Sequence, residues 1–486
     1  MQDPVTEVVG KSLVSHLLTV VGFLLAVFAI ARLLRAKKQP ANTIAWLFGI
    51  LLVPYVGVPL YLLFGGRKLA RLAASKGPLS PRLPLACPAS HSIHPTAQTM
   101  CTNGAIAPVG GNHVRLLTNG EETYAELERL ILGARHTIHI MTFILGHDDT
   151  GRRIVELLAR RAAEGSGSGI KVRLLLDALG CWFTSGHFIK PIIDAGGEVV
   201  KFMPMVPLSS RGSANLRNHR KIAVFDHHTA LVGGHNIARD YMGPEPWPKR
   251  FTDLGAIISG PAATILDEIF LADWTFASKR PLPPLALSPP HAELDLRQAL
   301  RPEGKSEVQI VANGPDVPGD PLYDGIVSMV QEAKRSLWII TPYFIPDEVL
   351  LRSLEVKARA GRDVTIILPA RSNHPITDYA RRPFLRQLMA AGVRVLAYQP
   401  GMLHSKAIIV DDQFALIGSA NMDMRSLFVN FEIGAMLYSQ EDARALRAWA
   451  GELIRECEPL TPDKIRRRRI LGNIAEDISR LLAPLL

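Results

Sequence analysis

The chain carries one short pattern of residues twice, and this duplication limits its fold more than any other feature. The pattern is H-x-K-x-x-x-x-D, and its members are His219, Lys221 and Asp226 in the first copy and His404, Lys406 and Asp411 in the second. A glycine and an asparagine follow both copies at the same offsets: Gly233 and Asn236, then Gly418 and Asn421. One such triple arises by chance in roughly a few per cent of chains of this length. Two copies with shared flanking residues predict two related halves that meet around one phosphate.

The regions around the two copies repeat the same order of strands and helices. Apolar periodicity predicts helices at 122–132 and 152–163 and strands at 137–145 and 171–175 in the first half. The corresponding elements of the second half are helices at 323–333 and 350–360 and strands at 336–340 and 363–368. Strands that alternate with helices indicate an α/β sheet in each half. We therefore expect an α/β fold of two pseudo-symmetric halves that form one active site.

The remaining segments differ from these halves in composition. We expect a membrane anchor at 1–75, the first half at 108–278, a proline-rich linker at 279–306, the second half at 307–457 and a basic amphipathic helix at 458–486. Within the anchor, residues 13–31 and 43–64 are apolar stretches that suit an α-helical membrane hairpin, or a span followed by a re-entrant segment. A signal peptide is the alternative for the first stretch, but its apolar run is long for that role. The C-terminal helix could pack on the protein or lie on a membrane surface.

The net charge limits the kind of partner, and the spacing of the cysteines limits the kind of compartment. The net charge of +10 suits an anionic partner, either nucleic acid or an acidic membrane surface. Lysines and arginines flank both sides of the apolar stretches, so their count does not fix the orientation in a membrane. The four cysteines form no C-x-x-C pair, which argues against a zinc site and favours a reducing compartment.

The two-residue period of a strand assigns different tasks to the motif residues. His219 and Lys221 are two positions apart and therefore face the same side of a strand. Asp226 lies at an odd spacing from His219 and faces the other side, and the second copy has the same spacing. The candidate catalytic set is both triples, in which each histidine and lysine reaches the phosphate and each aspartate holds a structural position.

The residue types suit phosphodiester chemistry without a metal. Lysine ammonium groups can neutralise the phosphate oxygens, and the candidate phosphate-binding residues Asn236, Asn421 and Ser419 can donate hydrogen bonds to them. One histidine can attack phosphorus while the other protonates the leaving alkoxide. No carboxylate cluster with metal-ligand spacing is evident, so we expect neither a metal nor another cofactor.

Two further carboxylates occupy corresponding positions after the two motifs. Asp253 and Glu432 each precede a short apolar segment with the same spacing to a glycine and an alanine. A nucleophilic histidine needs an acceptor on one ring nitrogen to fix its tautomer. We therefore assign Asp253 and Glu432 as histidine-orienting residues. Pseudo-symmetry leaves both histidines eligible for attack, and our hypothesis takes His219 as the nucleophile and His404 as the acid/base.

The paired motifs resemble the signature of the phospholipase D superfamily, over most of residues 114–437. The N-terminal Trp46, Pro54–Gly57 and Leu60–Gly65, and the terminal Leu481–Leu486, are similar to bacterial cardiolipin synthases. This resemblance implies transfer of a phosphatidyl group between two phosphatidylglycerols, with release of glycerol and a phosphatidyl-histidine intermediate. It also implies no metal cofactor, and a multi-pass protein of the bacterial inner membrane whose catalytic part faces the cytoplasm.

Other functions share the superfamily signature. A lipid hydrolase would resolve the covalent intermediate with water instead of an alcohol. A phosphatidylserine synthase or another phosphatidyltransferase would resolve it with a different alcohol. A nuclease has no evident need for membrane segments, so we expect phosphatidylglycerol and an anionic membrane as partners and no nucleic acid. A catalytically silent lipid-binding scaffold would have eroded motifs, whereas both motifs are complete. The second phospholipid and the oligomeric state stay open.

Overall fold

The structure is a computed structural model in two compact units, Met1–Ser75 with Ser213–Asn215 and Lys76–Gly212 with Leu216–Leu486. It describes residues 20–28, 30–31, 47–51, 53, 55, 57–58, 76, 79, 94–168, 170–203, 216–280 and 301–465.

The first unit is small and apolar in its described part. Residues 20–28, 30–31 and 47–51 are helical, and Ala26, Ile50 and Val58 form a small buried cluster. Many of its large apolar side chains are exposed, among them Phe23, Phe28 and Phe48. Of the helices that the structure describes, none combines the length and the apolar character needed to cross a bilayer. Much of the hairpin expected at 13–31 and 43–64 lies outside the described residues.

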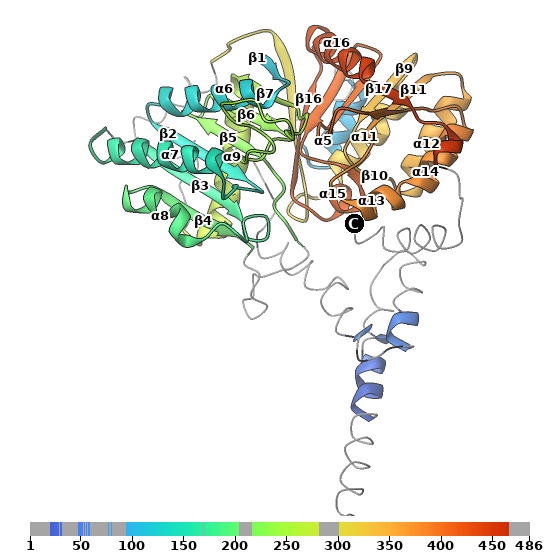
Figure 1. The fold of residues 1–486 in the computed structure, drawn as a ribbon, viewed down its shortest axis with the longest axis horizontal. Helices are drawn as coiled ribbons and strands as arrows, with labels where there is room; N and C mark the ends of the chain where they lie inside the picture. Colours follow the sequence, from blue (N-terminus) through green and yellow to red (C-terminus); the bar gives the residue numbers. More distant parts are fainter. Residues whose placement is uncertain are drawn as a thin grey trace, which may run out of the picture. The chain divides into compact units, whose positions relative to one another are not determined.

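The second unit is built on one mixed sheet of fifteen described strands (Figure 1). The strands of the first half are β1 (Val109–Leu117), β2 (Thr137–Thr142), β3 (Lys171–Asp177), β4 (Glu198–Phe202), β5 (Ile222–Phe225), β6 (Thr229–Gly233) and β7 (Gly255–Ser259). Those of the second half are β8 (Ser306–Asn313), β9 (Ser336–Ile340), β11 (Asp363–Pro369), β12 (Arg394–Tyr398), β13 (Ala407–Val410), β14 (Phe414–Gly418), β16 (Glu432–Leu437) and β17 (Cys457–Pro459).

The strand order shows the duplication directly. From the middle of the sheet outward, the first half runs β1-β7-β6-β5-β2-β3-β4, and the second runs β8-β16-β14-β13-β9-β11-β12 with β17 at the edge. β1 and β8 pair antiparallel and join the halves into one sheet, with Val109 opposite Val308. Each motif spans the strand at the same place in its half, β5 or β13, with the histidine and lysine before the strand and the aspartate after it. The α/β fold with two pseudo-symmetric halves is therefore confirmed.

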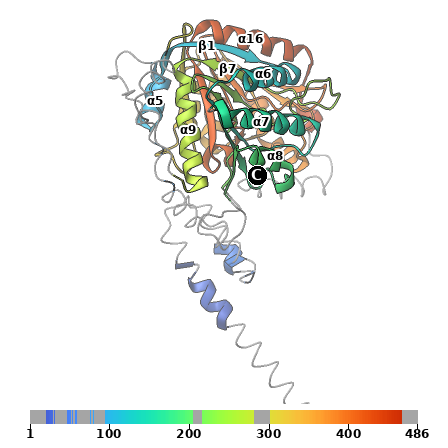
Figure 2. The same cartoon turned by 90° about the vertical axis from the view of Figure 1, so that its left-hand side faces the viewer.

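Helices cover the sheet on both faces. Those of the first half are α6 (Gly120–Gly133), α7 (Asp149–Ser168), α8 (Gly186–Asp194) and α9 (Pro261–Ser278), and those of the second are α11 (Pro321–Glu332), α12 (Glu348–Arg359), α13 (Pro375–Ala380), α14 (Arg382–Ala390), α15 (Met424–Phe428) and α16 (Gln440–Arg455). Figure 2 shows α9 on the side of the sheet away from α6, α7 and α8. Both α6 and α12 begin at a side-chain cap, because Asn119 accepts from the Glu122 N–H and Asp347 from the Leu350 N–H. The predicted helices and strands agree with these elements to within a few residues.

Two segments differ from the sequence prediction. The residues expected to begin a C-terminal helix instead form β17, which pairs antiparallel with β12, and a 3-10 helix at Pro462–Ile465. The main-chain hydrogen bonds of the sheet edge explain this start, and residues 466–486 lie outside the described part. In the connector before the first half, α5 (Pro95–Thr102) packs on α11, and its Met100 belongs to the core of the second half.

Candidate active site

The two histidine loops cross from one half to the other. The His219 N–H donates to the Phe431 carbonyl at 2.9 Å, and the His404 N–H donates to the Thr252 carbonyl at 2.8 Å. Isolated parallel bridges join Asn218 to Phe431 and Thr252 to Leu403. Each histidine loop therefore lies beside the segment of the other half that carries the candidate orienting carboxylate.

The side chains follow the same crossed arrangement. Nδ1 of His219 lies 3.0 Å from Glu432 Oε2, and Nδ1 of His404 lies 2.6 Å from Asp253 Oδ2. Both carboxylates are fully buried. An acceptor on Nδ1 leaves Nε2 of each ring as the atom that can react. The structure thus pairs both sequence-predicted carboxylates with histidines, and each pair joins the two halves.

The motif lysines lie next to their histidines. Lys221 Nζ donates to the His219 carbonyl at 2.7 Å, and Lys406 Nζ lies 3.1 Å from His404 Nε2. Burial lowers the pKa of Lys221 to about 7 and that of Lys406 to about 8. Repulsion by Lys406, a residue of the other half, also lowers the pKa of Lys221. The two ammonium groups therefore share one electrostatic environment that an anion would stabilise.

The histidines themselves are held neutral by their surroundings. Burial, and then repulsion by Lys406, lowers the pKa of His404 to about 3. Burial also lowers the pKa of His219, against the opposing attraction of Glu432. Burial alone would raise the pKa of Glu432, but the neighbouring His219 outweighs it and the pKa is lowered. A neutral ring with an ionised partner on Nδ1 is the state in which Nε2 can act as nucleophile or base.

The motif aspartates lie away from the histidines, in tight turns. Asp226 accepts from the backbone N–H groups of residues 135–137 at 2.7–2.9 Å. Asp411 accepts from those of residues 334–336 at 2.7–2.8 Å. Both have left-handed backbone conformations, with φ of 51° and 53°. The predicted structural position agrees with this placement, but the strand parity behind it does not hold, because β5 covers only Ile222–Phe225 and β13 only Ala407–Val410. The turn at each aspartate sets its direction instead.

The three candidate phosphate-binding residues are placed differently from one another. Asn236 Oδ1 accepts a hydrogen bond from the Ile144 N–H at 3.0 Å, so the amide nitrogen of Asn236 points away from Ile144. Asn421 lines a cavity together with His219. Ser419 differs from the prediction: its hydroxyl donates to Glu432 and accepts from the Ile433 N–H. The hydroxyl of Ser419 therefore supports the orienting carboxylate rather than facing a phosphate.

A polar cavity of about 310 Å³ opens beside His219. Its lining includes Tyr343, Arg425 and Asp423, and burial raises the pKa of Asp423 to about 6. Asn421 Oδ1, Ser426 Oγ and Asn430 Oδ1 also belong to lining residues, and they have no hydrogen-bond partner within the described part of the chain. The amide oxygens of Asn421 and Asn430 can only accept hydrogen bonds, so these buried atoms favour a ligand with hydroxyl groups. Sequence reasoning had named Asn421 but missed Tyr343, Asp423, Arg425, Ser426 and Asn430, since no motif marks them.

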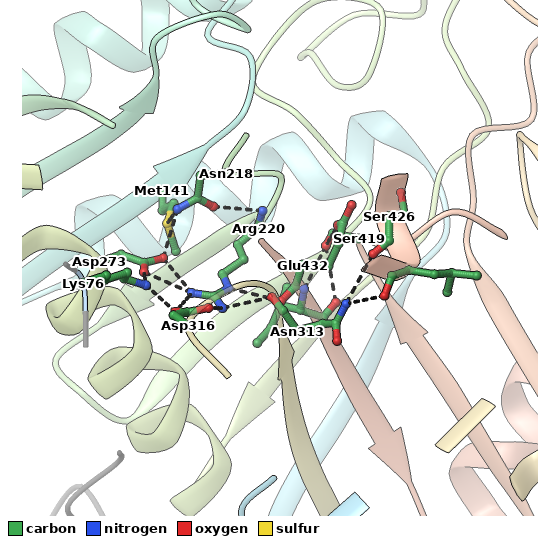
Figure 3. A network of polar contacts seen from close by, with 12 residues as sticks. Lys76, Met141, Asn218, Arg220, Asp273, Asn313, Asp316, Ser419, Ser426 and Glu432 are labelled. Atoms are coloured by element: carbon green, nitrogen blue, oxygen red, sulfur yellow. Dashed lines mark hydrogen bonds and ion pairs between the residues drawn. The ribbon is translucent and has the colours of Figure 1, made fainter. Parts of the chain in front are cut away.

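A buried charge cluster fixes the residue between His219 and Lys221 (Figure 3). Arg220 Nη1 bonds both oxygens of Asp273 at 3.0 Å, and Nη2 bonds Asp316 Oδ1 at 3.2 Å. The guanidinium also donates to the carbonyls of Glu432 and Asn313, both at 3.1 Å. Asp273 comes from the first half and Asp316 from the second, so Arg220 ties the halves together behind the site. Sequence reasoning missed this cluster too, because its members are far apart along the chain.

Elsewhere, three described side chains form a group with metal-ligand chemistry. His139 Nδ1 lies 2.6 Å from Asp267 Oδ1, and His227 Nδ1 contacts the other oxygen at 2.5 Å. Arg173 Nη1 lies 3.1 Å from His139 Nε2. Because the arginine can only donate, His139 keeps its proton on Nδ1 and donates to Asp267. This arrangement is a hydrogen-bonded group beside a cation, a poor fit for a metal ion.

The fold and the crossed histidine pairs define a class of two-halved phospholipase D-like proteins. The family model described as "Cardiolipin synthase, PLD-like domain" matches residues 127–274 and 326–454. A second model, "Phospholipase_D-nuclease N-terminal", matches residues 24–66. Among solved structures, phosphatidylserine synthase of Haemophilus influenzae has a similar fold, with a TM-score of 0.60 and 16% identity over 80% of this chain and 100% of that one.

Relatives with closer sequences carry one name. The chain is 36% identical to the cardiolipin synthase of Geobacillus thermodenitrificans, over 93% of this chain and 90% of that protein. It is 33% identical to cardiolipin synthase 2 of Bacillus anthracis, over 93% of this chain and 88% of the relative. The chain therefore belongs to the bacterial cardiolipin synthase family of the phospholipase D superfamily.

Proposed function

We propose that the protein is a phosphatidyltransferase that joins two phosphatidylglycerols into cardiolipin and releases glycerol. The observation that carries the proposal is the crossed pair of histidines, each oriented by a carboxylate of the other half, in a chain of the cardiolipin synthase family. Two oriented histidines beside two lysines match a reaction that passes through a covalent phosphoryl intermediate.

In the first step, Nε2 of one histidine attacks phosphorus of the donor phosphatidylglycerol. The P–O bond to the head-group glycerol breaks as the P–N bond forms. The second histidine, which takes up a proton on Nε2 once the anionic phosphodiester is bound, gives that proton to the departing glycerol oxygen. In the second step, that histidine removes a proton from a hydroxyl of the second phosphatidylglycerol. The resulting oxygen displaces the first histidine from phosphorus, so cardiolipin forms and both histidines return to their starting state.

We assign His219 as the nucleophile and His404 as the acid/base. The His219 side chain is 13% exposed and lines the cavity, whereas that of His404 is 5% exposed, and Lys406 Nζ lies 2.8 Å from its Nδ1 and 3.1 Å from its Nε2. Lys221 and Lys406, with Asn236 and Asn421, would hold the phosphate oxygens. Asp226 and Asp411 have no direct part in the chemistry in this proposal.

The first unit supplies the contact with the lipid phase in this proposal. Its exposed Phe23, Leu24, Phe28 and Phe48 form an apolar surface of the kind that contacts membranes. Cys181 and Cys457 are free among the described cysteines, as suits a reducing compartment. We propose the bacterial inner membrane as the location, with the catalytic unit on the cytoplasmic side and with phosphatidylglycerol and anionic lipid as partners.

The test uses the purified full chain with phosphatidylglycerol alone in mixed micelles. We expect cardiolipin and glycerol in equal amounts, and radiolabelled phosphorus trapped on His219 after a denaturing quench at alkaline pH, where the P–N bond survives. Phosphatidic acid as the only product would replace the transferase proposal with a hydrolase. DNA cleavage without lipid turnover would contradict a lipid function altogether.

A further inference from the structure

The buried charge cluster behind His219 contains one residue from outside both duplicated halves. Lys76 is the first residue of the second unit, and its ammonium group bonds both Asp273 and Asp316 (Figure 3). Its side chain is only 3% exposed, and both carboxylates are fully buried. A lysine buried this deeply and shared by two carboxylates is not an ordinary surface contact.

The cluster needs this lysine for charge balance. Asp273 and Asp316 bring two negative charges, whereas Arg220 brings one positive charge. Burial alone would raise the pKa of Asp273, but attraction by Arg220 and then by Lys76 outweighs it and lowers the pKa. With Lys76 in place, two cations face two anions. Without it, one negative charge stays buried and uncompensated, which is strongly unfavourable.

The same cluster binds the residues on both sides of the candidate nucleophile His219. Before His219, the Asn218 amide donates to Asp273 Oδ2 at 2.9 Å. After it, Arg220 bonds both carboxylates and the Glu432 carbonyl. The position of the His219 ring, and of its partner Glu432, therefore depends on the cluster being complete.

Lys76 also reaches this region through an aromatic ring. Its Nζ lies 4.8 Å from the centre of the Phe431 ring, within the range of a cation–π contact. The Phe431 carbonyl accepts the hydrogen bond from the His219 N–H. Three residues further along the connector, the Leu79 N–H donates to the Asp316 carbonyl at 2.8 Å. The connector is thus tied at two points to the segment that carries Asp316.

We propose that Lys76 is a positioning residue for His219, and that seating of the connector in the catalytic unit is a condition of an assembled active site. Lys76 touches no reacting atom in this proposal. It acts by completing the charge cluster that fixes Asn218, Arg220 and the Glu432 backbone. Because Lys76 directly follows the first unit in the chain, the proposal links the integrity of the site to the segment that leads from the lipid contact.

The test compares Lys76→Met, Lys76→Arg and the double variant Lys76→Met/Asp316→Asn in the phosphatidylglycerol assay, whose activity readout rests on the proposed function. We expect Lys76→Met to lower kcat about 100-fold with little change in KM, because a misplaced reacting group loses rate rather than binding. Lys76→Arg keeps the charge and should retain more activity than Lys76→Met. The double variant removes one cation and one anion, so it should recover much of kcat.

The matched control is Lys190→Met, which breaks the exposed contact of Lys190 with Asp194 at 2.7 Å and should leave kcat unchanged. A kcat of Lys76→Met close to wild type, or a folded double variant no more active than Lys76→Met, would overturn the proposal. If Lys76→Met does not fold, the other two variants still decide, since both should be folded and active. If the wild type makes no cardiolipin, the proposed function fails. The charge cluster is then tested by chemical denaturation, in which the unfolding midpoint of the double variant must be higher than that of Lys76→Met.

Discussion

At the scale of single residues, the site is built from two histidine–carboxylate pairs. In each pair, the histidine comes from one half and the carboxylate from the other. Glu432 serves His219 and Asp253 serves His404, both through Nδ1. Ser419 adds a hydrogen bond to Glu432, while Asp253 also accepts from the Leu254 N–H at 2.8 Å. The two pairs are therefore similar in geometry but have different support, which gives the two histidines different surroundings.

Glu432→Gln should lower kcat about 1000-fold, since an amide can present a donor to Nδ1 and stabilise the wrong tautomer of His219. KM should change little, because Glu432 does not touch the substrate in our proposal. The measurement is steady-state cardiolipin synthesis together with the rate of phosphoenzyme formation. The control is Glu452→Gln, which alters an exposed carboxylate paired with Arg455 at 2.6 Å. Near-normal activity of Glu432→Gln would contradict the orienting role.

The buried lysines predict the alkaline side of the pH profile. A lysine is charged below its pKa, and the pKa values of Lys221 and Lys406 are lowered to about 7 and about 8. The free enzyme therefore loses its phosphate-binding charges as the pH rises through this range. We expect kcat/KM for phosphatidylglycerol to fall between about pH 7 and pH 9, because this ratio reports the free enzyme.

Lys221→Arg tests the cause of that fall, since arginine stays charged throughout. Its kcat/KM should be lower at neutral pH, because the guanidinium does not fit the lysine position, but it should decline less steeply above pH 7. A wild-type kcat/KM that stays constant or rises up to about pH 9 would show that these ammonium groups do not control binding.

At the scale of elements, the motif aspartates in the turns after β5 and β13 have a structural role. Asp226 and Asp411 bind the backbone of the loop before the neighbouring strand, β2 or β9. Burial alone would raise the pKa of Asp411, but its hydrogen bonds from backbone N–H groups lower it. This stabilising contribution is present above the pKa that the residue has in the unfolded chain, and it is lost as the pH falls through the lower folded-state pKa.

Asp411→Ala should destabilise the protein by about 3 kcal/mol, because it leaves several backbone N–H groups without their acceptor. The matched control is Asp412→Ala. Asp412 has a similar φ of 56°, but its carboxylate makes a long contact of 3.7 Å to Arg447 in place of several hydrogen bonds from the backbone. Chemical denaturation of both variants measures the difference. Equal losses for the two substitutions would mean that the left-handed backbone, and not the carboxylate, accounts for the effect.

At the scale of the whole molecule, one continuous sheet brings the two motifs together. β1 and β8 join the halves edge to edge, and the buried Arg220 ties them behind the site. Both histidine–carboxylate contacts lie within a single chain. One chain therefore contains every residue of the proposed chemistry, whatever its oligomeric state.

Co-expression of His219→Asn with His404→Asn tests this arrangement. Each variant alone should lose activity on the order of 10⁴-fold, because two histidines act as a unit. The mixture should stay equally inactive, since no single chain holds both histidines. His113→Asn, at an exposed histidine, is the control and should stay active. Activity in the mixture would mean that the site forms between chains, and near-normal activity of either single variant would refute a shared site.

The sequence allowed most of the architecture to be predicted. Helices such as 122–132 and strands such as 336–340 were predicted correctly because apolar periodicity and burial act locally. The start of the C-terminal helix, predicted at residue 458, was wrong because residues 457–459 pair with β12, a long-range contact that local pattern does not specify. Ser419 was expected on the phosphate because it shares a motif with Asn421. Its rotamer depends on Glu432, which local pattern does not specify.

The duplicated motif by itself predicted that two histidines and two lysines serve one site, with the aspartates in a structural position. Only the tertiary structure decided that the orienting carboxylates cross between halves, and that Arg220, Asp273, Asp316 and Lys76 form one buried cluster. The reason is physical. Periodicity and motif spacing report which face of an element a side chain occupies, whereas charge compensation in the interior depends on segments far apart in sequence that only the folded chain brings together.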